Sequence, residues 1–123
     1  MIEIGIKHTS QIAVTEEMTA MKIGSGDLPV LATPMMLALM ENAAMLAVQD
    51  VLEDGQTTVG GYIEASHLKP SKIGAVVHAV AEVTKIEGKK IAYRIAAYCG
   101  DTLLGEGTHV RFIVDLERFM AKL

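Results

Sequence analysis

The chain has 123 residues, half of them apolar, with no Trp, three Tyr, two Phe and a formal charge of −4. We expect residues 1–123 to form a single domain, since a chain of this length can bury a core without disulfides. The mild negative charge and the lack of a basic run argue against nucleic acid as a partner. The sequence contains no phosphate-binding glycine loop and no GxSxG elbow. It also has no paired Cys or His at ligand spacing, so we expect no metal site.

The sequence is typical of a cytoplasmic protein. The first ten residues, "MIEIGIKHTS", lack the positive start and apolar core of a signal peptide. The apolar run 33–52 is interrupted at Glu41, Asn42 and Gln49, so no segment reaches the ~20 apolar residues that a bilayer requires. A single cysteine, Cys99, suits a reducing compartment, and we expect it to be a small buried side chain. We therefore expect no membrane partner.

The first half of the chain predicts a strand, a loop and a helix. Residues 2–14 are rich in Ile and Val with partial alternation, which favours a strand. Residues 15–30 lose this period and carry the Gly and Pro of a loop. Thr33 followed by Pro34 predicts the N-cap and first turn of a helix that runs to about residue 52. Gly55 follows at a position suited to the C-terminal cap.

The second half predicts four strands and a short tail. The breaks "IEGKK" and "CGDT" look like tight hairpin turns, so we expect these strands to form an antiparallel meander. Residues 116–123 predict a short helix or extension. The predicted strands span residues 57–70, 75–88, 89–100 and 101–115.

One long helix and about five strands indicate the α+β class. The helix is apolar nearly all round, because Met35, Leu39, Leu46 and Val48 point in different directions, so it must be covered on most sides. A curved antiparallel sheet wrapped around the helix, with a second copy covering the remainder, satisfies this requirement. The sequence therefore predicts a hotdog fold and a homodimer.

Glu41 is the first candidate for chemistry. Its neighbours on the helix are Leu37, Ala38, Ala44 and Met45, and none can pair with a carboxylate. It must therefore find a partner on another element, reach a wet cleft or change its pKa. An ordinary exposed glutamate, on a polar side near Asn42, is the alternative.

His67 is the second candidate. Alternation in "YIEASHLKP" places Ile63, Ala65 and His67 on the side that faces the helix. Histidine suits proton transfer near neutral pH, although a core histidine bonded to backbone is the alternative. His78 and His109 look like outer-face residues, and Arg111 shares the face of His109. His8 has no acidic or nucleophilic neighbour.

Thr33 and the pair Gly60–Gly61 complete the candidates. A hydroxyl at a helix N-terminus can touch a reacting carbonyl, or it can serve as an N-cap and nothing more. Two adjacent glycines inside a strand indicate a bulge or a close approach by a ligand or another backbone. We expect Gly60, Gly61 and Asn42 to contact a substrate.

The segments "LATPMMLALMENAA", "GGYIEASHLKPSKIG" and "GTHVRFIVDLERF" resemble the fluoroacetyl-CoA thioesterase-like family of hotdog proteins, from about residue 10 to residue 121. The resemblance assigns Thr33, Glu41 and His67 as catalytic residues and matches Gly60 to a family glycine. It implies hydrolysis of an acyl-CoA by a homodimer, or a dimer of dimers, with the site at the dimer interface. No cofactor is implied beyond the CoA of the substrate.

One segment departs from the family. The fluoroacetate-specific member carries phenylalanines in the loop before the helix, whereas "MKIGSGDLPVLA" has no aromatic residue. We therefore expect a short- or medium-chain acyl group without fluoroacetyl specificity. Glu41 would be a nucleophile or a general base. The alternatives are a non-catalytic acyl-CoA or lipid-binding hotdog module and a hotdog enoyl-CoA hydratase. Lys69, Lys72 and Arg111 could contact the CoA phosphates, with solvated surface charge as the other interpretation.

Overall fold

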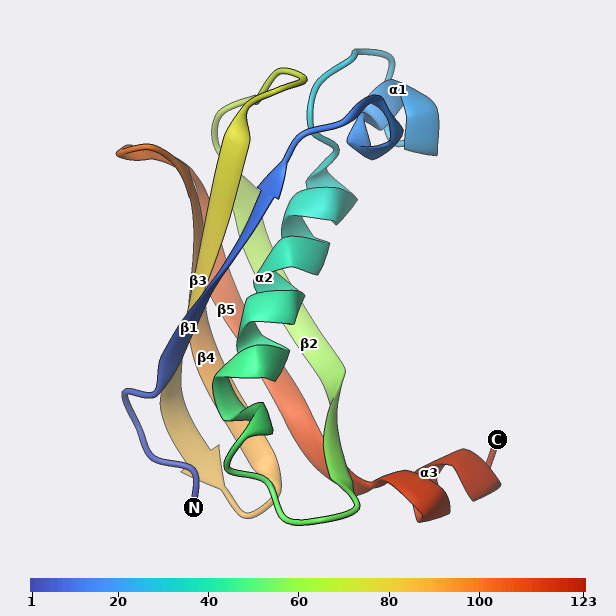
Figure 1. Cartoon of the computed structure of the whole chain (residues 1–123), viewed down its shortest axis with the longest axis vertical. Coiled ribbons are helices and arrows are strands. Elements are labelled where there is room, and N and C mark those ends of the chain that lie inside the picture. Colours follow the sequence, from blue (N-terminus) through green and yellow to red (C-terminus); the bar gives the residue numbers. More distant parts are fainter.

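The computed structural model describes residues 1–123, and five antiparallel strands curl around one long helix (Figure 1). This arrangement confirms the predicted α+β hotdog architecture. No helix is both long and apolar enough to cross a membrane. The elements are β1 (Lys7–Ala13), the 3-10 turn η1 (Glu16–Met18), α1 (Ala20–Ile23), α2 (Thr33–Gln49), β2 (Gln56–His67), β3 (Val76–Glu87), β4 (Lys90–Cys99), β5 (Thr102–Asp115) and α3 (Leu116–Ala121).

The strand order is β1-β3-β4-β5-β2, which corrects the predicted four-strand meander. Strands β3, β4 and β5 do form a meander, with two-residue turns at Gly88 and Gly100, where φ is 61° and 58°. Strand β2 instead pairs with β5 and forms the far edge of the sheet. The segment from residue 68 to residue 75 carries the chain from the β2 edge across to β3, which lies between β1 and β4, and it is held by a bridge between Val30 and Lys72.

Helix α2 begins one residue earlier than predicted. Ala32 is the N-cap and Thr33 is already helical, so the prediction that the Thr33 hydroxyl caps the helix is wrong. Pro34 lies in the first turn, where its missing N–H leaves no bond unmade. The helix ends at Gln49 rather than near residue 52, and Gly55, with φ 82°, shapes the following turn instead of the cap.

The predicted loop at residues 15–30 contains two short helical segments. Thr19 caps α1 by accepting a hydrogen bond from the Lys22 N–H, and Gly24 ends it with φ 87°. These segments bring the 20–31 region against the start of α2, because Ala32 donates its N–H to the Met18 carbonyl.

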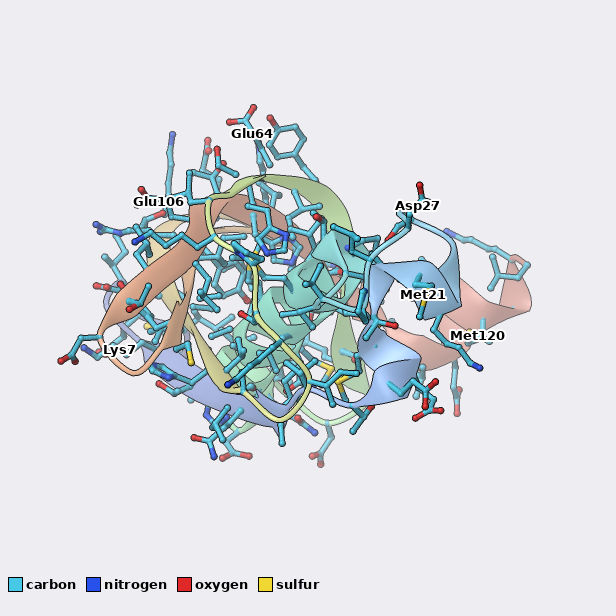
Figure 2. All side chains as sticks on the ribbon, turned by 90° about the horizontal axis from the view of Figure 1, so that it is seen from above. Lys7, Met21, Asp27, Glu64, Glu106 and Met120 are labelled. Carbon is cyan, nitrogen blue, oxygen red and sulfur yellow. The ribbon has the colours of Figure 1, made fainter.

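The core lies between α2 and the inward faces of β3 and β4. Every second residue of these strands is buried, and many of them are alanine or valine, so the helix can approach the sheet closely. Figure 2 shows Glu64 and Glu106 pointing away from this core, and Met21 on the outside of α1. Cys99 is half-buried at the end of β4. The helix contributes Met36, Leu39, Met40, Ala43, Ala44 and Val48 to the core.

We expect Met40→Ala to lower the free energy of unfolding by about 2–5 kcal/mol, because it opens a cavity in a packed core. Met40 is 0% exposed, whereas Met21 is 51% exposed. The matched variant Met21→Ala should change the free energy by less than about 0.5 kcal/mol. Urea denaturation of both variants measures the difference, and equal losses would contradict the assignment of the core.

Candidate active site

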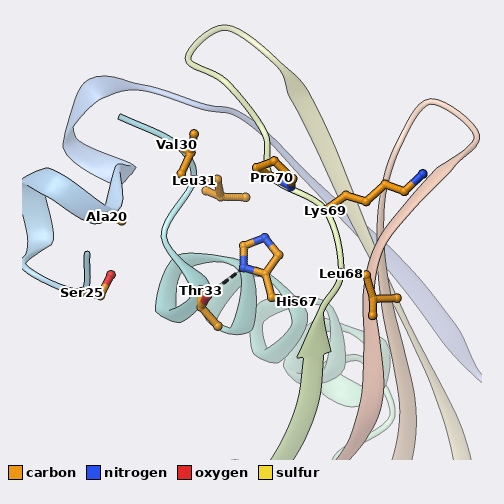
Figure 3. A pocket seen from close by; sticks show the side chains of 9 residues that line it. All are labelled: Ala20, Ser25, Val30, Leu31, Thr33, His67, Leu68, Lys69 and Pro70. Carbon is orange, nitrogen blue, oxygen red and sulfur yellow. Dashed lines mark hydrogen bonds between the residues drawn. The ribbon is translucent and has the colours of Figure 1, made fainter. Parts of the chain in front are cut away.

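Thr33 and His67 form the first centre of the site. The Thr33 Oγ1 lies 2.7 Å from the His67 Nδ1, as Figure 3 shows. Thr33 starts α2 and His67 ends β2, and β2 turns His67 toward the helix together with Ile63 and Ala65, as predicted. The His67 Nε2 is buried without a hydrogen-bond partner. Burial lowers the pKa of His67, so its ring is neutral near pH 7.

A cleft of about 290 Å³ opens beside this pair (Figure 3). One wall comes from α1 and the segment leading into α2, and the other comes from the residues that follow β2. The lining of the cleft contains no aromatic side chain apart from the imidazole of His67. The lining residues are Ala20, Ser25, Val30, Leu31, Thr33, His67, Leu68, Lys69 and Pro70.

The start of α2 offers one free backbone donor to the cleft. Met35 and Met36 both donate their N–H groups to the Ala32 carbonyl, at 3.0 and 3.1 Å, and Pro34 has no N–H. The Thr33 N–H is the remaining first-turn donor, at the positive end of the helix dipole. Thr33 therefore presents a hydroxyl and a backbone N–H at the same place.

Glu41 forms a second centre with two basic side chains of β5. Its Oε2 lies 3.6 Å from the Arg111 Nη1 and 4.0 Å from the His109 Nε2. The carboxylate side chain is 42% exposed, while His109 and Arg111 are 1% and 7% exposed. The prediction that His109 and Arg111 lie on the outer face, with Arg111 as surface charge, is therefore wrong. Within one chain, no ion pair or hydrogen bond joins Glu41 to His67.

Arg111 is fixed from several sides. Its Nε donates to the Thr58 Oγ1 at 2.9 Å, and its Nη2 donates to the Thr58 carbonyl at 3.0 Å. Its Nη1 lies 3.3 Å from the His109 Nε2. Burial lowers the pKa of Arg111 below its ordinary value, and Tyr93 and the Glu41 carboxylate oppose this shift. The ring of Tyr93, whose pKa burial raises to about 12, stacks on His109 with centroids 5.8 Å apart.

Gly60 makes room for this cluster. The register of β2 against β5 shifts between Gly60 and Tyr62, which confirms the predicted bulge. A Cβ on Gly60 would lie 2.7 Å from the Glu41 Oε2 and 3.6 Å from the Arg111 Nη1. The absence of a side chain at Gly60 thus lets the carboxylate reach Arg111.

Gly61 and Asn42 lie away from both centres. A Cβ on Gly61 would meet the ring of Phe112, so this glycine faces the other side of the sheet. The Asn42 Oδ1 accepts a hydrogen bond from the Ser10 hydroxyl at 2.6 Å, which places this amide on the flank of α2 next to β1. Their predicted contact with a substrate stays a prediction.

Sequence reasoning missed His109 and Arg111 because β5 reverses the usual alternation. Its outward positions carry apolar Val110 and Phe112, while His109 and Arg111 point inward. The available signal was Glu41 itself, because a carboxylate on an apolar helix requires a cation from another element.

Comparisons with known proteins identify the family of the chain. Residues 14–117 match the profile of the family described as fluoroacetyl-CoA-specific thioesterase. The fluoroacetyl-CoA thioesterase of Streptantibioticus cattleyicolor is 36% identical over 94 residues, which cover 76% of this chain and 68% of that protein. A solved structure of the fluoroacetyl-CoA thioesterase superposes with a TM-score of 0.92 at 30% identity, covering 99% of this chain and 95% of that chain.

A Thermus thermophilus protein of the thioesterase superfamily superposes equally well, with a TM-score of 0.91 at 32% identity, covering 99% of this chain and 90% of that chain. The family profile spans β2, β3, β4, β5 and the whole of α2, and therefore includes both centres of the site. The chain belongs to the fluoroacetyl-CoA-specific thioesterase family.

Proposed function

We propose that this chain, as an acyl-CoA thioesterase, hydrolyses a short- or medium-chain acyl-CoA to the free acid and CoA, without specificity for fluoroacetyl. The observation that carries the proposal is the 2.7 Å contact between Thr33 and His67 at the start of α2, beside an open cleft. The segment before the helix has no aromatic side chain, and Val30 supplies aliphatic surface instead. An aliphatic acyl group suits such a wall.

The proposed mechanism places the thioester carbonyl beside the Thr33 N–H, which stabilises its developing negative charge, while the Thr33 hydroxyl holds His67 in place. Glu41 either attacks the carbonyl, giving a transient anhydride, or removes a proton from an attacking water. The carbon–sulfur bond then breaks, and the CoA thiolate takes up a proton. A neutral His67 whose Nδ1 accepts from the Thr33 hydroxyl carries its proton on Nε2 and can donate a hydrogen bond from there to the leaving sulfur. The proton that the thiolate takes up comes from the water consumed in the hydrolysis, either directly or through Glu41. No cofactor takes part in these steps.

We further propose a cytoplasmic homodimer, alone or paired into a dimer of dimers, whose site is completed across the interface. Thr33 and Glu41 are eight residues apart on α2, which is about 12 Å along the helix axis. Gly60 and His67 are roughly 20 Å apart along β2. One thioester cannot meet both centres of one chain at that spacing. A second copy can bring its Glu41 to the Thr33–His67 pair, and β2 has a free edge along which to pair.

A thiol-release assay with acyl-CoAs of increasing chain length tests the activity. We expect turnover of short or medium chains, and we expect Glu41→Gln and His67→Ala each to lower kcat by about 10²- to 10³-fold. Glu106→Gln is the matched control, since Glu106 is exposed on the outward side of β5 (Figure 2).

Full turnover by Glu41→Gln would contradict its catalytic role. Ligand-dependent thermal stabilisation without thiol release would instead identify a non-catalytic acyl-CoA or lipid-binding module. Turnover of an enoyl-CoA without release of free CoA would identify a hydratase.

Mixed dimers test whether the site is shared. We expect Thr33→Val and Glu41→Gln homodimers to be inactive, whereas a heterodimer of the two variants regains one intact site, with Thr33 and His67 from one copy and Glu41 from the other. Co-expression with two affinity tags isolates the heterodimer, which should release thiol at about half the wild-type rate, because one of its two sites is intact. A folded heterodimer without activity would show that all three residues act within one chain.

Gly60→Ala tests the space beside Glu41. We expect a kcat about 10- to 100-fold lower, because the new Cβ displaces the carboxylate from Arg111. The free energy of unfolding should change little, since the crowded atom is the end of a flexible side chain. Ser66→Ala, at an exposed outward position of the same strand, is the control for activity and for urea denaturation. Unchanged kcat in Gly60→Ala would show that this contact plays no part in turnover.

A further inference from the structure

His109 is a buried titratable group that the proposed mechanism leaves without a role. It is 1% exposed in the middle of β5, and both of its ring nitrogens have partners. Its Nδ1 lies 2.7 Å from the Tyr62 carbonyl oxygen, and its Nε2 lies 3.3 Å from the Arg111 Nη1. The ring therefore connects the bulge of β2 to the cation that faces Glu41.

The Tyr62 carbonyl fixes the tautomer of His109. A carbonyl oxygen only accepts hydrogen bonds, so the His109 Nδ1 must carry the proton. In a neutral ring the Nε2 is then bare, and it can accept the Arg111 Nη1–H. The bulge that begins at Gly60 therefore determines which ring nitrogen of His109 is left to accept a hydrogen bond from Arg111.

The surroundings of His109 keep it neutral. The titratable groups that face it are Glu41 from α2, Arg111 from β5 and Tyr93 from β4. Burial is the largest effect on the pKa of His109 and lowers it, and the nearby Arg111 guanidinium acts in the same direction. The hydrogen bond to the Tyr62 carbonyl and the Glu41 carboxylate oppose the shift without reversing it. A protonated ring would turn a second donor toward Arg111 and place two positive charges side by side.

We propose that His109 is a positioning residue, which aims the Nη1 of Arg111 at the Glu41 carboxylate by accepting one of its hydrogens. Thr58 holds the Nε and the Nη2 along one edge of the planar guanidinium. His109 contacts the Nη1 on the opposite side, so it limits how far the plane can tilt about that edge. The same Nη1 lies 3.6 Å from the Glu41 Oε2. The inference rests on the proposed catalytic role of Glu41 and adds a residue that acts on the substrate only through Arg111.

Two substitutions separate the two hydrogen bonds of His109. In His109→Asn the amide N–H takes the place of the Nδ1 and keeps the bond to the Tyr62 carbonyl, but nothing reaches Arg111. In His109→Gln the longer side chain places an amide oxygen near the former Nε2, where it accepts from Arg111. We expect His109→Asn to lower kcat on the order of 10- to 100-fold with little change in KM, and His109→Gln to recover most of that loss.

His78→Gln is the matched control, since His78 is half-buried on the outer face of β3 and stacks on Tyr98 away from the site. The melting temperature of each variant distinguishes a variant that is less stably folded from one in which only the Arg111 guanidinium is misplaced. Equal losses of kcat in His109→Asn and His109→Gln that follow the melting temperature would overturn the proposal, because His109 would then be structural alone. Unchanged kcat in His109→Asn would overturn it as well.

Two readouts do not need turnover. The nitrogen-15 spectrum of the wild-type histidines at pH 7 should show one ring with a protonated Nδ1 and a bare Nε2. The signals of this ring should be absent in His109→Gln. A ring assigned to His109 with a protonated Nε2 would overturn the proposal. The crystal structure of His109→Asn should show the Arg111 Nη1 turned away from Glu41, and an unmoved guanidinium would also overturn it. A failure of the proposed function appears separately, as wild-type protein that releases no thiol.

Discussion

The buried charge of Arg111 is the constraint on which the site depends. A guanidinium that is 7% exposed has lost most of its hydration, and the interior must replace it with acceptors. Thr58 supplies two of these acceptors and His109 a third. Glu41 supplies the compensating negative charge from α2. The glutamate in the middle of an apolar helix is therefore the counter-charge of a cation that the sheet has already buried.

This constraint also accounts for the irregularity of β2. A regular strand would place a side chain where the Glu41 carboxylate approaches Arg111, and glycine at position 60 removes that obstacle. The register shift after Gly60 leaves the Tyr62 carbonyl facing His109, whose Nδ1–H satisfies it. A bulge weakens a sheet locally, yet here its unpaired backbone group is used to orient a side chain of the site.

The local elements were predictable because local patterns determine them. Alternation of apolar residues and the glycines at positions 88 and 100 marked the strands and turns of β3 to β5 to within two residues. The place of β2 was not predictable, because an edge position depends on where the 68–75 connection crosses the fold. The Thr-Pro pair marked the helix start correctly, but Ala32 takes the cap position, and His67, 34 residues away, engages the Thr33 hydroxyl. Such long-range partners leave no trace in local spacing.

The two centres differ in how they meet solvent, and this difference suits different tasks. The Glu41 carboxylate is 42% exposed, and the buried guanidinium of Arg111 stabilises its charge from the protein side. Its other side is open to solvent, where a reacting atom could approach. The Thr33–His67 pair lies in a cleft at a helix N-terminus, where a hydroxyl, a backbone N–H and a neutral imidazole favour developing negative charge and proton transfer. A nucleophile or base needs access, whereas an oxyanion site needs rigid donors. Thr33 and Glu41 lie on the same helix, so the distance between the two centres within one chain is fixed by α2.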